Sequence, residues 1–355
     1  MISLVDVEEQ SFKELKELRD VLDSQGRRTY TVPMNKITLS EDGILHADRF
    51  EGPLAKAAMR GFLHTEGAPV DFVMNRCPTD LSVEIVNRLA CETNTSITIQ
   101  ATNGVATGIM PADRQPIQYE MLIDRIGIER PIKEAVLSPD LLRITAVNGD
   151  SKELLPKDAF GFGWELVASE HGWLTTEVSR LAVRLICTNG LVGFDKNPVL
   201  RRSYNSRESV LRFLHRLVYV LDHEIRPPDL EPALKWAADR RIGREQNHVL
   251  KYLTQRLGGD ATRLELRDVT EDTSWYELLN TITSLARLYS VGLRRRYEAE
   301  GGMLLHWFSR QGRGKPPWRR RLCEECIAWD SSDMTSPDIT VGKASPTPVI
   351  GQSQK

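Results

Sequence analysis

The chain has 355 residues, of which 41% are hydrophobic and 27% charged, and its formal net charge is −2. These values are typical of a globular protein with two domains or one large mixed domain. No apolar stretch is long enough to span a membrane, and the acidic start lacks the features of a signal peptide, so we expect a cytoplasmic protein. Because the chain is nearly neutral, nucleic-acid binding would require a local basic patch.

The predicted elements alternate between short strands and helices in the first half of the chain and are mostly helical afterwards. Helical spacing of apolar residues predicts helices over residues 6–24, 53–64, 78–90, 119–126, 206–226, 232–241, 245–257 and 274–298. Strand-like runs occur over residues 29–46, 96–102, 105–111, 134–138, 141–147, 163–169 and 178–192.

The strongest local signal is Asn103-Gly104, between the runs SITIQAT and VATGIMP. Both central residues of a two-residue hairpin turn need positive φ, which Asn and Gly tolerate. The sequence therefore predicts a β-hairpin here.

For three helices the sequence also predicts a cap, a buried face or an end. Thr79 or Asp80 is expected to cap the helix whose apolar stripe is Leu81, Ile85 and Leu89. The helix after Ser206 is expected to bury one face, and the arginines 294–296 are expected to end a helix, where cations suit the dipole. The expected buried face of the helix after Ser206 consists of Val210, Leu211, Leu214, Leu217, Val218 and Leu221.

Strands that follow one another without long helical crossovers favour antiparallel pairing. We therefore predict an α+β fold, mainly an antiparallel sheet with packed helices, followed by a mostly helical C-terminal region. The expected divisions are an α+β core (1–200), a helical region packed on it (201–308), a basic linker (309–329) and a disordered tail (330–355) rich in Ser, Thr, Pro and Gly.

Five scattered cysteines do not describe a disulfide framework and favour a reducing compartment. Cys323 and Cys326 have metal-ligand spacing, but a structural zinc site needs four ligands and no second cysteine pair exists, so no metal is expected. The sequence lacks the phosphate-binding loop, the His-Glu-x-x-His motif and the nucleophile-elbow motif. We expect no cofactor and no recognisable enzyme chemistry.

Several segments resemble one known family. They are GIMPADRQPIQYEMLIDR (108–125), the Ser169-Glu170 pair with Gly172, SRLAVRLICTNGLV (179–192), SWYELLNTITSLA (274–286) and the helix RCPTDLSVEIVNRLA (76–90). Together they are similar to a phage/plasmid-like protein family of unknown function, whose most specific mark is Cys-Thr-Asn-Gly at 187–190. The resemblance covers residues 70–290 and departs from the family pattern at Gln115 and His171. It implies the biology of a mobile genetic element and supplies no reaction.

One candidate functional loop region follows from the segments of this resemblance. It comprises Asp113, Arg114, Glu170, His171, Cys187 and Asn189. If these side chains gather in a pocket, the chain is an enzyme of unknown reaction. The structural alternatives are that Asp113 caps the helix at Tyr119 and that Cys187 is a buried strand residue.

A second candidate region is the basic segment SRQGRGKPPWRRR (309–321), which contains no acidic residue. Flexible basic segments with an aromatic residue bind single strands, because cations follow the phosphates and the ring stacks on a base. Trp318 is expected to stack, and the phosphate contacts are assigned to Arg310, Arg313, Lys315, Arg319, Arg320 and Arg321. A second group of basic residues lies over 201–216.

The sequence thus favours a non-enzymatic, nucleic-acid-binding accessory protein of a phage, plasmid or integrated element, with single-stranded DNA in replication or recombination as the expected partner. The alternatives are the enzyme just described and an assembly protein that forms a homo-oligomer through a sheet edge or its first helix.

Overall fold

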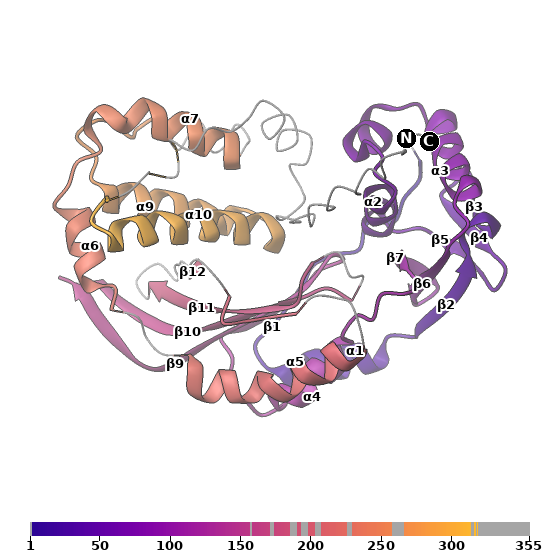
Figure 1. Ribbon diagram of the computed structural model, residues 1–355, viewed down its shortest axis with the longest axis horizontal. Helices are drawn as coiled ribbons and strands as arrows, with labels where there is room; N and C mark the ends of the chain where they lie inside the picture. The colour runs from indigo at the N-terminus through magenta and orange to yellow at the C-terminus, as the bar shows by residue number, and fades with distance from the viewer. Residues whose placement is uncertain are drawn as a thin grey trace, which may run out of the picture.

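Pairing in this chain is local: most strands lie beside their neighbours in sequence, and every pairing between two named strands is antiparallel. The computed structural model describes residues 2–156, 158–170, 174–184, 190–192, 198–202, 207–225, 229–257, 266–313, 316 and 318. Within these ranges the protein has an α+β fold with a helical C-terminal region, as the sequence predicts (Figure 1).

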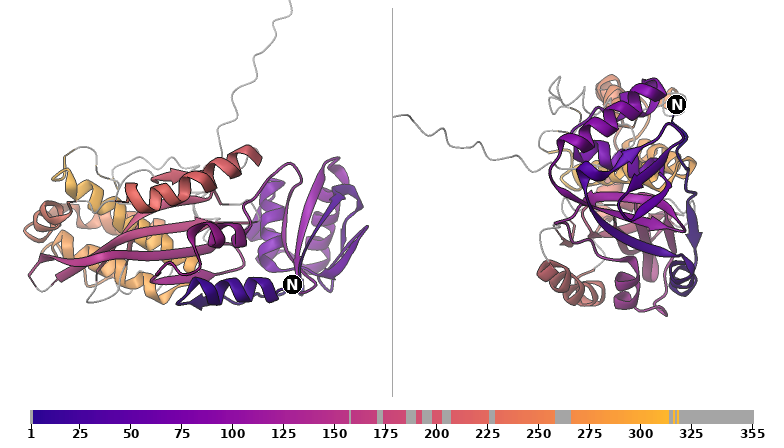
Figure 2. Two further views of the ribbon diagram at one scale, coloured as in Figure 1. Left: turned by 90° about the horizontal axis from the view of Figure 1, so that it is seen from below. Right: turned by 90° about the vertical axis from the view of Figure 1, so that its right-hand side faces the viewer.

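The central sheet has the strand order β1-β8-β9-β10-β11-β12, and β13 also pairs with β11. Its strands are β1 (Gln10–Phe12), β8 (Glu134–Leu137), β9 (Leu142–Leu155), β10 (Asp158–Ala168), β11 (Glu177–Arg184), β12 (Gly190–Val192) and β13 (Leu200–Arg201). Helices cover both faces of this sheet (Figures 1 and 2). On one face lie α1 (Leu15–Ser24), α4 (Tyr119–Ile126) and α5 (Arg207–Tyr219). On the other lie α6 (Glu231–Ala238), α7 (Gln246–Leu257), α9 (Trp275–Leu285) and α10 (Val291–Ser309).

A smaller N-terminal part lies at one end of the central sheet and has its own hydrophobic core (Figure 1). It contains the sheets β2-β6-β7 and β3-β4-β5, together with two helices. Their bounds are β2 (Arg27–Pro33), β3 (Thr38–Leu39), β4 (Ile44–Ala47), β5 (Phe50–Pro53), α2 (Lys56–Thr65), α3 (Thr79–Glu92), β6 (Ser96–Thr102) and β7 (Val105–Pro111). The expected core of residues 1–200 is thus divided into two packed parts.

The predicted hairpin is confirmed: β6 and β7 are joined through Asn103 and Gly104, with φ of 52° and 83°. Both residues adopt the left-handed conformation, which costs glycine nothing and asparagine little. This hairpin forms two of the three strands of its sheet, next to β2.

Some predicted details of the helices are wrong. The N-cap of α3 is Pro78, with no side-chain cap. Of the predicted stripe, Ile85 and Leu89 are half-buried against the core, but Leu81 is 41% exposed, and the residues that α3 buries fully are Ser82, Val86 and Ala90. The packed side extends beyond the predicted stripe because it also carries polar groups that the neighbouring backbone satisfies. Asn87 donates to the carbonyl of Leu39 at 3.0 Å, and Ser82 donates to the carbonyl of Val73 at 2.8 Å.

The single helix expected over residues 274–298 is two helices, α9 and α10. The arginines 294–296 therefore lie near the beginning of α10, not at a helix end. There the carboxylate of Glu9 accepts a hydrogen bond from the backbone N–H of Val291 at 2.9 Å, which offsets the cost of cations near a helix N-terminus.

A buried ion-pair network fixes α10 to the central sheet. Arg143 on β9 donates to Glu165 on β10 at 2.6 Å and also to Glu298 on α10, and all three side chains are almost completely buried. Arg295 donates to the other oxygen of Glu165 at 3.3 Å, and Arg294 bonds to Glu298 at 3.3 Å. Burial alone would raise the pKa of Glu165, but Arg143 and Arg295 hold it below its ordinary value.

Candidate functional site

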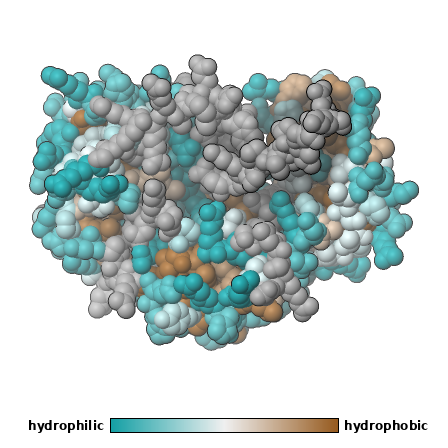
Figure 3. Space-filling model, in the orientation of Figure 1, coloured by the Kyte–Doolittle hydropathy of each residue, from teal (hydrophilic) through white to brown (hydrophobic). Residues whose placement is uncertain are grey.

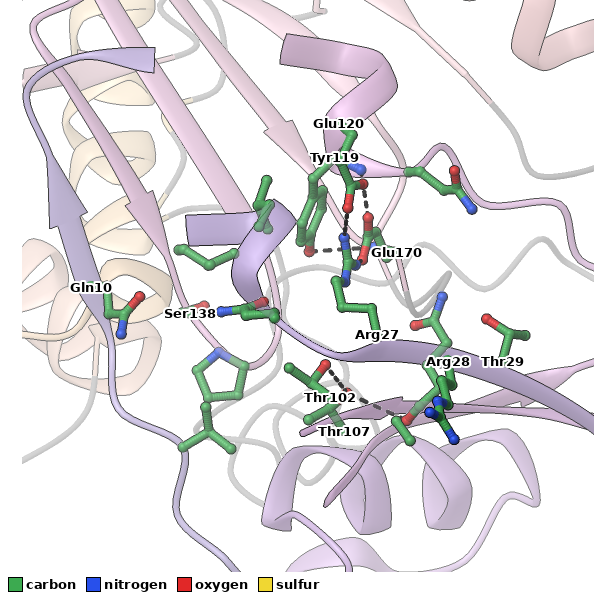
Figure 4. Close-up of a pocket in the computed structure, with 18 of the residues that line it drawn as sticks. Gln10, Arg27, Arg28, Thr29, Thr102, Thr107, Tyr119, Glu120, Ser138 and Glu170 are labelled. Carbon is green, nitrogen blue, oxygen red and sulfur yellow. Dashed lines mark hydrogen bonds and ion pairs between the residues drawn. The ribbon is translucent and has the colours of Figure 1, made fainter. Parts of the chain in front are cut away.

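A cavity of about 330 Å³ lies where the N-terminal part meets the central sheet (Figure 4). Its walls come from β1, β2, β6 and β7, from the N-terminal end of α4, and from residues that follow β8 and β10. Most of its polar lining is uncharged, and it includes the amides of Gln10, Gln25, Gln100 and Gln118 and the hydroxyls of Thr102, Thr107 and Ser138.

Charged residues at one end of this cavity pair with one another. Arg27, from β2, forms ion pairs with Glu120 on α4 and with Glu170 beyond β10. Figure 4 shows its side chain reaching toward these two carboxylates, while Arg28, the next residue, points the other way. The Glu170 side chain is only 1% exposed, so its charge needs this partner.

Glu170 also caps α4. One of its carboxylate oxygens accepts a hydrogen bond from the backbone N–H of Tyr119, and the N–H of Glu170 donates to the Tyr119 hydroxyl at 3.4 Å. A carboxylate at a helix N-terminus is favourable because it satisfies an unpaired N–H and complements the dipole. Glu170 therefore takes the capping role that was one alternative for Asp113.

The structure brings only one of the loop-region candidates into this cavity. Glu170 lines it, whereas Asp113 is exposed and Arg114 is half-buried in the turn after β7, and neither lines it. His171, Cys187 and Asn189 lie outside the described residues. Sequence reasoning missed Arg27, Tyr119 and Glu120, because they come from segments far from Glu170 and form no local motif.

The basic segment begins beside a cluster of aromatic side chains. Trp318 is only 8% exposed, and its ring stacks on Trp275 with centroids 5.0 Å apart. Its indole N–H donates to Glu245 at 2.8 Å, and its ring also meets Trp307 edge-on. The expected stacking of Trp318 on a base is therefore corrected: its faces are occupied by protein, and it anchors the segment.

Two of the predicted phosphate contacts are described, and both are exposed. Arg310 and Arg313 follow α10 in a turn in which Gly312 has φ of 69°. A Cβ at Gly312 would lie 3.0 Å from Trp236 and 3.1 Å from Trp307, so this turn needs glycine to pack on the aromatic cluster. Lys315, Arg319, Arg320 and Arg321 lie outside the described residues.

The outer face of α5 combines exposed aromatic, apolar and basic side chains. Tyr219 is 56% exposed and Leu211 is 57% exposed, although Leu211 was expected on the buried face; Phe213 is buried in its place. Arg212 and Arg216 lie on the same face, which continues to His223, whose ring is 4.9 Å from that of Tyr219. Figure 3 shows apolar and hydrophilic surface side by side over the region of α4 and α5.

Ion pairing does not remove Arg216 from solvent. Arg216 pairs with Glu224 at 3.2 Å, but its side chain remains 57% exposed, and an exposed pair of this kind contributes less than about 1 kcal/mol. A phosphate could therefore displace Glu224 at low cost. The sequence reveals the arginines of this face, and what it misses is that Leu211 and Tyr219 stay exposed beside them.

Comparison with known proteins gives no match: no protein-family model, no curated protein and no solved structure resembles the chain closely enough to be counted. The resemblance to the phage/plasmid-like family therefore stays a prediction from the sequence. None of the helices that the structure describes is long and apolar enough to cross a membrane. The described residues contain no cluster of His, Cys, Asp or Glu that could hold a metal ion.

Proposed function

We propose that the protein binds single-stranded nucleic acid through the outer face of α5, with the basic residues after α10 as a second contact. The observation that carries this proposal is the exposure of Tyr219 beside Arg212 and Arg216 on one helix face. Side chains three and four positions apart on a helix are neighbours, so these three form one surface.

Exposed aromatic and basic side chains on one surface are suited to binding a single strand of nucleic acid. Unpaired bases offer flat faces that stack on an exposed aromatic ring, and the phosphates between them attract arginines. Trp318 does not offer such a face, whereas Tyr219 does. Because the whole chain is nearly neutral, the affinity must come from such local surfaces.

The second contact consists of Arg310 and Arg313, joined in sequence to Lys315 and Arg319–Arg321. Trp318 anchors the start of this segment to the protein body through Trp275 and Glu245. The resemblance of residues 70–290 to mobile-element proteins supports a role in the replication or recombination of a phage, plasmid or integrated element.

The test is fluorescence anisotropy with labelled single- and double-stranded oligonucleotides of one sequence, at two salt concentrations. The triple variant Arg212→Gln, Arg216→Gln, Tyr219→Ala is expected to lose at least about tenfold in single-strand affinity, since stacking contributes about 1–3 kcal/mol per base. Retention of full affinity by this variant would rule out the α5 surface.

A matched control is available on the N-terminal part. The variant Arg76→Gln, Arg88→Gln, Phe72→Ala removes the same charge and one exposed aromatic ring, since Phe72 is 46% exposed and both arginine side chains are more than 70% exposed. Its affinity should match that of the unmodified protein. Equal losses in both variants would indicate non-specific electrostatic attraction.

A further inference from the structure

The charges that line the cavity of Figure 4 disfavour an anionic ligand. At its inner end one arginine, Arg27, pairs with two carboxylates, Glu120 and Glu170, so this end keeps a net negative charge. At its rim Arg28 and Glu8 are both exposed and carry opposite charges. A molecule that enters this space meets mainly uncharged hydrogen-bonding groups.

Three glutamine side chains in the lining have amide groups available for hydrogen bonding to a ligand. Gln10 on β1, Gln25 after α1 and Gln118 before α4 make no side-chain hydrogen bond to any other residue in the described part of the chain. Each amide offers two donors and one acceptor with two lone pairs. They come from three separate segments, so a single ligand could meet them from different directions.

The rest of the lining is divided between hydroxyls and apolar side chains. The hydroxyls of Thr102 and Thr107 lie 3.2 Å apart on the β6–β7 hairpin. Leu22, Ala101 and Leu137 supply apolar surface. The matching ligand therefore bears no negative charge, carries donors and acceptors on its edges, has apolar faces and bears hydroxyl groups.

We propose that this cavity binds a nucleoside. A glutamine amide pairs bidentately with adjacent donor and acceptor positions on the edge of a base, as it does with adenine. The faces of the base are apolar, and the ribose hydroxyls match the threonine pair. The volume of about 330 Å³ is at the lower end of the range for small-molecule sites. This site is separate from the α5 surface and goes beyond the proposed function.

The first experiment measures binding to the full-length protein by isothermal titration calorimetry and thermal shift. The probes are adenosine, guanosine, cytidine and uridine, with glucose as a ring that bears hydroxyls but no base. At least one nucleoside is expected to bind with a stoichiometry of one and to raise the Tm, while glucose does neither. No binding by any nucleoside at millimolar concentration overturns the proposal, and so does glucose binding as tightly as the nucleosides.

The second experiment locates the site. Gln25→Leu and Gln118→Leu remove amides that support no described part of the fold, and each should weaken nucleoside binding about tenfold. Gln115→Leu is the matched control, because Gln115 is exposed on the same loop as Gln118 but does not line the cavity. Unchanged affinity in both cavity variants overturns the assignment. The triple variant of α5 should bind the nucleoside normally, which separates this result from that of the oligonucleotide test.

Discussion

Arg143 on β9 is hydrogen-bonded to Glu298 on α10, 155 residues later in the chain, and both side chains are about 1% exposed. This contact fixes the long C-terminal helix to the middle of the central sheet. The energetic consequences of such a pair are asymmetric, since two paired buried charges contribute little net stability whereas one left alone is costly.

Glu298→Gln should therefore destabilise the protein strongly. The substitution leaves the buried Arg143 guanidinium with one carboxylate instead of two, and we expect a loss of about 3 kcal/mol in the free energy of unfolding. Urea denaturation followed by circular dichroism measures it. The control is Glu84→Gln, which breaks an exposed pair with Arg88 and should cost less than about 1 kcal/mol. Equal losses in the two variants would contradict the role of burial.

Lys133 lies beside this network, and we expect it to make the free energy of unfolding depend on pH in the alkaline range. Burial, with a further contribution from Arg294, lowers its pKa from 10.5 to about 8. The unfolded chain therefore binds this proton more tightly, so the contribution of Lys133 to stability rises between about pH 8 and pH 10.5. Lys133→Met is expected to raise the Tm at pH 7, and the gain should shrink as the pH approaches 10. A gain of the same size at both pH values would show that repacking, not charge, is responsible.

Trp318→Leu should lower stability without weakening single-strand binding. The substitution removes the stack on Trp275 and the hydrogen bond to Glu245. Truncation of a buried aromatic side chain to alanine costs about 3–5 kcal/mol, and because leucine fills part of the space we expect a loss of about 2–3 kcal/mol. Thermal unfolding measures the first effect, and anisotropy well below the transition measures the second. Lower affinity with an unchanged Tm would restore the interpretation that Trp318 stacks on a base.

Arg310→Gln together with Arg313→Gln should reduce the salt dependence of single-strand binding. Each lost phosphate contact lowers the slope of log affinity against log salt by about 0.7, so two lost contacts lower it by about 1.4. Anisotropy titrations at four or more salt concentrations give this slope. The Arg76→Gln, Arg88→Gln double variant is the control and should keep the original slope.

Features that depend on local rules could be predicted from the sequence. The hairpin at Asn103-Gly104 follows from the φ values that two residues can adopt, and the antiparallel pairing follows from the short connections. The polar part of the packed side of α3 could not be predicted, because Asn87 and Ser82 lie there and are satisfied by the backbone of Leu39 and Val73. Hydropathy assigns such residues to the surface.

The cavity could not be predicted from the sequence, for a different reason. Arg27, Glu120 and Glu170 are separated by 93 and about 50 residues, and their pairing depends on how the N-terminal part meets the central sheet. The same holds for the helix caps supplied by Glu9 and Glu170, since each carboxylate comes from a distant segment. The α5 surface was partly accessible, because its arginines are visible in the sequence and the exposure of Tyr219 is not.

Four of the seven tryptophans, at positions 236, 275, 307 and 318, lie in the aromatic cluster beneath the turn that follows α10. Intrinsic fluorescence will therefore report mainly on this end of the molecule, whereas far-ultraviolet circular dichroism averages over every helix and strand. Comparing the two signals during denaturation shows whether the aromatic cluster unfolds before the rest of the protein. If the transitions coincide, the aromatic cluster and the rest of the fold unfold as one cooperative unit.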